Sequence, residues 1–184
     1  MTKNLYLEII NCHSPIDARN ILLKLNGKIN WKPLGGRINN LSTVNLGSDP
    51  AAGVIERITN SMDAVIESSL NGHDAENRNP REIVEELFSI KEGRLKSIKD
   101  FKKQNELTKK IQVTVLDSGN TNRPTLEIRD HGIGVDAKDF SNTVLSLNAN
   151  NKIKKQHLLG AFGQGGATSF SYNDITLIMS KKNK

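Results

Sequence analysis

The sequence predicts a mixed α/β domain in which helices come first and a β-hairpin follows. Two observations predict this class: helix-start signals at Asp49-Pro50 and Asn79-Pro80, and a change to two-residue apolar alternation from Ile111 onward. At 184 residues the chain is long enough for one domain with a sizeable core. We therefore expect a single α+β domain.

The longest predicted helix begins with Asp49 as its N-cap and runs to about Leu70. On a helical wheel Glu56, Asn60 and Asp63 fall on one side, opposite an apolar arc of roughly 120°. We expect the apolar face to pack on the sheet. Side chains that simply face water explain the three polar residues equally well. The apolar arc consists of Ala51, Val54, Ile55, Ile58, Met62, Val65 and Ile66.

The same signals predict the remaining elements. In chain order they are a short helix over 18–25, a helix from Asn79-Pro80 with Glu82 as a capping box, a second and basic helix to about Lys109, a hairpin of 111–115 and 125–129, a helix capped by Asp136, and a strand over 174–179.

A strand ending at Asp130 runs into a turn that contains Gly132 and Gly134. A carboxylate at a strand end can accept a hydrogen bond from an exocyclic amine such as adenine N6, and glycines let the backbone approach a flat ring. An ordinary Asp-x-Gly turn explains the pattern as well. The residue three after Gly134 is Ala137, so no Rossmann GxGxxG motif fits.

A glycine-rich segment, from Gly160 to Gly166, follows a polar and basic stretch. Backbone N–H groups in such a loop, before a helix, form a cradle for phosphate. No Lys-Ser/Thr pair follows the glycines, which excludes a P-loop. The two interpretations are a lid over an anion and a flexible connection.

The order of these motifs is more specific than any one of them. E-x-x-x-N-x-x-D-A on a helix, D-x-G-x-G after a strand and G-x-x-G-x-G-G after a polar stretch together resemble the GHKL superfamily. Its members include the B subunit of gyrase, the large heat-shock chaperone, sensor histidine kinases and the mismatch-repair protein MutL. The resemblance covers about residues 46–180. The matching residues are Glu56, Asn60, Asp63-Ala64, Asp130 to Gly134 and Gly160 to Gly165.

The resemblance implies a Bergerat fold, a two-layer α/β sandwich with helices packed on one face of a mixed, mostly antiparallel sheet. It implies that Asn60 coordinates Mg²⁺, that Asp130 binds the adenine amine of ATP, and that Glu56 orients and deprotonates the attacking water. The other nucleotide-binding residues that it implies are Asp63, Gly132 and Gly134 in the pocket, and Gly160, Ala161, Phe162, Gly163, Gln164, Gly165 and Gly166 around the phosphates.

Glu56 favours ATP hydrolysis over phosphate transfer to protein, since the histidine kinases generally place His or Asn at that position. We expect an ATPase that acts as a conformational and dimerisation switch, with a homodimer or another protein as partner. The alternative is a nucleotide-gated binding module with little or no turnover.

The distance between motifs predicts the domain organisation. Between Ala64 and Asp130 lie 65 residues, more than in compact relatives, so we expect a helical insertion over about 72–110. One predicted strand follows the glycine loop, where the family adds further strands and a second domain. We therefore expect the N-terminal module of a larger protein, with residues 1–45 as an extension of unknown role and 46–184 as the ATP-binding domain.

The positive charge is concentrated in one segment. The net charge is +6, and residues 91–110 alone hold eight Lys/Arg against three acidic residues. Such a stretch attracts DNA or RNA. The alternative is a solvated helix whose lysine stems cover apolar surface.

The remaining composition indicates a cytoplasmic protein without membrane contact. No apolar run approaches the roughly 20 residues of a membrane helix, and the N-terminus has no secretory pattern. Cys12 is the single cysteine, so no internal disulfide forms. The four histidines show no metal-ligand spacing, and the expected metal is the Mg²⁺ held by Asn60.

Overall fold

The structure, a computed structural model, describes residues 3–31, 49–70, 72, 75, 78–140, 158–159 and 172–182. These residues form five α-helices and one antiparallel pair of strands, which confirms the mixed α/β class. The two-layer Bergerat sandwich stays a prediction. The elements are α1 (Lys3–Ile10), α2 (Pro15–Lys24), α3 (Pro50–Ser69), α4 (Pro80–Phe88), α5 (Phe101–Thr108), β1 (Ile111–Leu116) and β2 (Thr125–Asp130).

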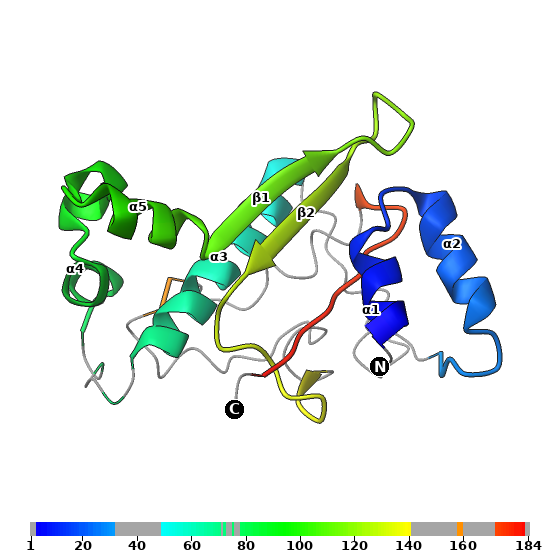
Figure 1. Ribbon diagram of the computed structural model, residues 1–184, viewed down its shortest axis with the longest axis horizontal. Helices are drawn as coiled ribbons and strands as arrows, with labels where there is room; N and C mark the ends of the chain where they lie inside the picture. The colour runs from blue at the N-terminus through cyan, green and yellow to red at the C-terminus, as the bar shows by residue number, and fades with distance from the viewer. Residues whose placement is uncertain are drawn as a thin grey trace.

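The hairpin of β1 and β2 lies at the centre of the molecule, with α3 crossing behind it (Figure 1). Helices α1 and α2 stand at one end, and α4 and α5 stand at the other (Figure 1). The Thr125 hydroxyl donates to the carbonyl oxygen of His13 at 2.5 Å, which ties the α1–α2 connection to the start of β2. Among the described residues, no helix has the length and apolarity needed to cross a membrane.

Two of the helices begin at the residues that the sequence predicted. The Asp49 carboxylate accepts from the N–H of Ala51 at 2.9 Å and caps α3. The Asn79 side chain caps α4 by accepting from the N–H of Glu82 at 3.0 Å, and it donates back to the Glu82 carboxylate at 2.5 Å. The Glu82 carboxylate therefore accepts from the side chain of Asn79, whereas in the predicted capping box it would accept from the backbone N–H of Asn79.

The short helix expected over 18–25 begins earlier, at Pro15, because Ser14 and Asp17 form a capping box. The Ser14 hydroxyl and the amide of His13 donate to the Asp17 carboxylate, at 2.8 and 3.1 Å. These bonds, that of Ser14 first, lower the pKa of the Asp17 carboxyl from its ordinary value.

The second, basic helix predicted to about Lys109 is confirmed as α5, which ends at Thr108 but is short. Two single 3-10 turns, η3 (Lys91–Gly93) and η4 (Leu95–Ser97), precede α5. Ser89, Glu92 and Gly93 have positive φ values of 59°, 53° and 68°, a left-handed conformation that a helix cannot contain. Asp100 then starts α5 by accepting from the N–H of Lys102 at 2.8 Å.

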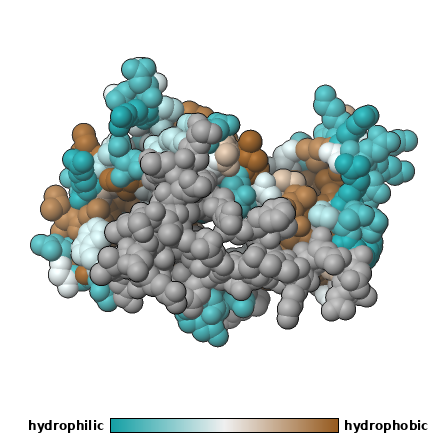
Figure 2. Space-filling view, turned by 180° about the vertical axis from the view of Figure 1, so that it is seen from behind, coloured by the Kyte–Doolittle hydropathy of each residue, from teal (hydrophilic) through white to brown (hydrophobic). Residues whose placement is uncertain are grey.

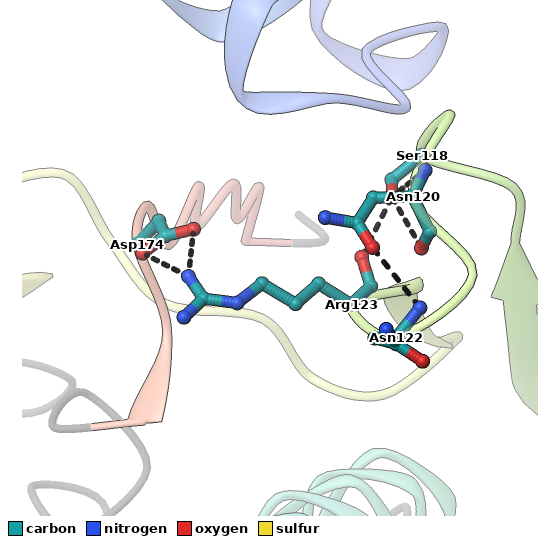
Figure 3. A network of polar contacts seen from close by, with 5 residues as sticks. All are labelled: Ser118, Asn120, Asn122, Arg123 and Asp174. Atoms are coloured by element: carbon teal, nitrogen blue, oxygen red, sulfur yellow. Dashed lines mark hydrogen bonds and ion pairs between the residues drawn. The ribbon is translucent and has the colours of Figure 1, made fainter.

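The predicted hairpin is confirmed. Ile111 pairs with Asp130 and Leu116 with Thr125, in an antiparallel register. The connecting loop is held by the Ser118 hydroxyl, which donates to the carbonyl of Arg123 at 2.6 Å. The guanidinium of Arg123 reaches out of this loop to Asp174, with its Nη1 3.1 and 3.2 Å from the two carboxylate oxygens (Figure 3).

The strand predicted over 174–179 is wrong, because this segment is extended but joins no ladder among the described residues. Its ends are nevertheless fixed: Asp174 pairs with Arg123, and the Ser180 hydroxyl accepts from the N–H of Val135 at 2.8 Å. These contacts make the segment run parallel to β2 (Figure 1). The helix expected after Asp136 begins with a bond from the N–H of Lys138 at 3.2 Å, and beyond residue 140 it lies outside the described residues.

The largest fully buried apolar side chains belong to α3 and α4, namely Ile66 and Ile83. Leu158 joins their cluster, so the residues just before the glycine-rich segment pack into this core. The predicted insertion over 72–110 therefore shares the core of the chain through α4. The cluster consists of Ile66, Ala75, Ile83 and Leu158, with Leu70, Val84, Leu87 and Phe88 packed against it.

Candidate functional site

The polar row of α3 does not simply face water. Asp63 is 1% exposed, whereas Ile55, on the predicted apolar face, is 62% exposed. Glu56 and Asn60 are half-buried. A polar helix face that is buried while part of the apolar face stays exposed needs specific partners.

Glu56 and Asn60 contact each other one helical turn apart. The Asn60 amide nitrogen donates to the Glu56 carboxylate at 3.4 Å. Partial burial lowers the pKa of the neighbouring Arg57 guanidinium from its ordinary value, and the Glu56 carboxylate opposes that shift. The guanidinium stays charged, so a fixed positive charge lies beside Glu56.

The turn from Asp130 to Gly134, here called the Asp130 turn, docks directly on α3. The Ser61 hydroxyl donates to the Asp130 carboxylate at 3.3 Å, and the N–H of Ile133 donates to the carbonyl of Ala64 at 2.9 Å. A Cβ on Gly132 would lie 2.6 Å from the carbonyl carbon of Ala64, too close for any other residue type. Glycine is therefore required for this turn to reach the helix.

The Asp130 carboxylate has one local and one tertiary partner. One oxygen accepts from the N–H of Gly132 at 2.9 Å, and the other accepts from Ser61. Asp130 remains exposed, and each carboxylate oxygen has a second lone pair. This geometry leaves the carboxylate able to accept a further hydrogen bond from a ligand amine.

Asp63 makes a contact that the sequence did not predict. Its buried carboxyl accepts from the N–H of Leu159 at 2.7 Å, directly before the glycine-rich segment. It therefore anchors the entry to that segment. The expected phosphate-binding residues, Gly160, Ala161, Phe162, Gly163, Gln164, Gly165 and Gly166, lie outside the described residues.

Gly134 closes the turn with a positive φ of 67°. A Cβ there would lie 2.7 Å from the carbonyl carbon of Lys181, so this glycine admits the backbone of the C-terminal segment. Gly134 lies in the turn, as the sequence predicted. The group that packs against it here is backbone of the same chain.

Sequence reasoning missed Ser61. It lies on the packing side of α3, three residues after Ile58 and four before Val65, and it is 6% exposed. A small polar residue within an apolar arc is the signal that another backbone approaches the helix there. The hydroxyl of Ser180, which binds the N–H of Val135, has no comparable signal in the sequence.

The part of the chain that the structure describes contains no group of three or more His, Cys, Asp or Glu that could hold a metal. The Asn60 carboxamide and the Glu56 carboxylate offer oxygen atoms, the ligands that Mg²⁺ prefers. Because Mg²⁺ in nucleotide sites takes most of its ligands from phosphates and water, this donor set fits a nucleotide-bound ion.

Comparisons with protein-family models, with curated proteins and with solved structures find no match to this chain.

Proposed function

We propose that this chain binds ATP with Mg²⁺ at the Asp130 turn and the polar row of α3 and hydrolyses it, as a conformational and dimerisation switch. The single observation that carries the proposal is that α3 bonds both to the Asp130 turn and to the residue before the glycine-rich segment. The Asp130 turn bonds to Ser61 and Ala64, within the helix that carries Glu56 and Asn60, and Asp63 of that helix binds the residue before the glycine-rich segment.

The proposed nucleotide would use these groups for separate tasks. The Asp130 carboxylate accepts a hydrogen bond from the adenine amine, and Gly132 lets the turn that carries this carboxylate dock on α3. Asn60 and Glu56 face the phosphate end, and the glycine-rich segment supplies backbone N–H donors to the phosphates. Bound magnesium neutralises phosphate charge.

In the proposed hydrolysis Glu56 orients the attacking water and accepts its proton. The half-buried carboxylate is held by Asn60 and lies beside the charged Arg57, so its position is restricted. A positioned general base contributes about 10²–10⁴-fold to such a rate.

The binding part of the proposal is tested by calorimetric titration with Mg-ATP. We expect Asp130→Asn to weaken binding about 10- to 100-fold, because a bond from the adenine amine to a charged acceptor contributes about 1.5–3 kcal/mol.

Asp117→Asn is the matched control. Asp117 makes the same local bond, from the N–H of Gly119 at 2.8 Å, in an exposed turn at the other end of the hairpin. If Asp130→Asn binds Mg-ATP as tightly as Asp117→Asn does, the site is assigned wrongly.

A further inference from the structure

The segment of residues 91–110, here called the basic segment, carries its charge outward. Seven of its eight Lys/Arg residues are exposed, and only Lys110 is half-buried. The charged groups of these seven side chains are therefore accessible to a partner. In Figure 2 the outer side of the end that holds α4 and α5 is largely hydrophilic.

The basic segment is folded and held in place, although runs of like charge are usually disordered. The Ser97 hydroxyl accepts from the N–H of Lys91 at 2.7 Å, and the Gln104 side chain donates to the carbonyl of Leu95 at 3.3 Å. Ile98, at 7% exposure, anchors the middle of the segment. The charges are thus presented on a fixed scaffold, which lowers the entropy lost when a partner binds.

The acidic residues of the basic segment do little to neutralise it. Asp100 is engaged as the N-cap of α5. Within the described residues, Arg94 is the only one of the eight cations with a carboxylate within ion-pair distance, 3.6 Å from the exposed Glu92. Apart from the half-buried Lys110, the other cations present their charge to the solvent.

We propose that the basic segment binds the phosphate backbone of a nucleic acid. Exposed, preorganised cations without carboxylate partners match a regularly spaced polyanion, because each phosphate contact releases a counterion. A membrane partner is disfavoured, since an interfacial helix needs a broad apolar face and α5 exposes a single large apolar side chain, Phe101. This inference is independent of ATP, because the segment lies outside the nucleotide site.

The test measures fluorescence anisotropy of labelled duplex DNA and labelled single-stranded RNA, without nucleotide, from low to physiological salt. We expect the affinity to fall with salt at a slope of about −0.9 per phosphate contact on duplex DNA. Comparison of the two probes identifies which backbone is bound more tightly.

The variant is the pair Lys102→Glu and Lys103→Glu. Both residues lie in the first turn of α5, where an acidic side chain favours the helix dipole, so the variant should fold. Loss of two phosphate contacts at about 0.1 M salt weakens duplex binding roughly 60-fold.

The matched control is the pair Arg19→Glu and Lys28→Glu, which changes the net charge equally at the exposed α2 end. The control should bind nearly as tightly as the unaltered chain. Equal losses in both variants would show attraction by net charge alone and overturn the proposal. So would the absence of binding at low salt, salt-independent binding, or a preference for phosphatidylserine vesicles over both nucleic acids.

Discussion

The hairpin has an Asp-x-Gly turn at each end, and the two turns have different surroundings. In both, the aspartate accepts a bond from the glycine N–H, at 2.8 Å for Asp117 and 2.9 Å for Asp130. A Cβ on Gly119 would meet nothing within 4 Å, whereas one on Gly132 would overlap Ala64. The local motif therefore carries no function by itself. Docking on α3 is what distinguishes the Asp130 turn.

The largest expected effect is on ATP turnover, and it tests whether α3 with the docked Asp130 turn forms an ATPase site. We expect Glu56→Ala to retain Mg-ATP binding while turnover falls about 10²–10⁴-fold, because the variant lacks the general base. Single-turnover measurement of phosphate release, alongside titration of binding, checks this. Unchanged turnover would end the assignment of Glu56. If neither chain hydrolyses ATP, the nucleotide-gated binding module becomes the better description.

Alanine substitutions at Gly132 and Gly119 compare the two turns by their effect on the stability of the fold. Gly132→Ala forces Ala64 or the turn to move, and overpacking of this kind costs about 1–3 kcal/mol. In a chain of this length that lowers the Tm by roughly 2–4 °C per kcal/mol. Gly119→Ala meets no neighbour, but its φ of 79° costs about 1–2 kcal/mol by itself.

The outcome that distinguishes the two glycines is nucleotide binding. Gly132→Ala should weaken binding of Mg-ATP, and Gly119→Ala should leave it unchanged. If the two variants bind equally well, the docked turn is a packing feature only.

Asp63→Ala tests the anchor of the glycine-rich segment. The variant leaves the N–H of Leu159 without its acceptor, which costs about 1–3 kcal/mol. Thermal unfolding should show a lower Tm, and Asp63→Asn, which keeps an acceptor oxygen, should lose less. Equal losses in Ala and Asn would mean that the bond to Leu159 is not what Asp63 contributes.

The smallest effect is expected for Ser61→Ala. It removes a neutral donor from the Asp130 carboxylate, which costs about 1 kcal/mol or less because Asp130 is exposed. The Asp130 turn should stay docked through the bond between Ile133 and Ala64. A loss of Mg-ATP binding as large as that of Asp130→Asn would show that Ser61 itself positions the carboxylate.

Predictions from the sequence succeeded where the cause was local. Asp49-Pro50 and Asn79-Pro80 determine their helix starts through bonds within three residues, and alternation determined the hairpin. Predictions failed where the structure depends on residues that are distant in the sequence. Residues 174–179 have the strand pattern, but a strand also needs a neighbouring backbone in register. The 3-10 turns before α5 were also not predicted: Glu92 has no particular preference for positive φ, and only Gly93 signalled the break.

The candidate site shows the same difference between local causes and causes that are distant in the sequence. The identity of Glu56, Asn60 and Asp130 followed from motif order, but their surroundings did not. The burial of Asp63 against Leu159 depends on a contact across 96 residues of sequence, and no pattern within one helix encodes it.

The segment beside β2 has a consequence for hydrogen exchange. The N–H of His131 donates to the carbonyl of Lys110 at 2.9 Å, which extends the hairpin ladder by one pair. Since hydrogen-bonded pairs alternate along an antiparallel ladder, the amides of Leu126, Ile128 and Asp130 point away from β1, toward residues 174–180. Their exchange rates therefore report on that edge of β2: slow exchange would mean that a third strand has formed there in solution, and fast exchange that the edge is open to a second chain.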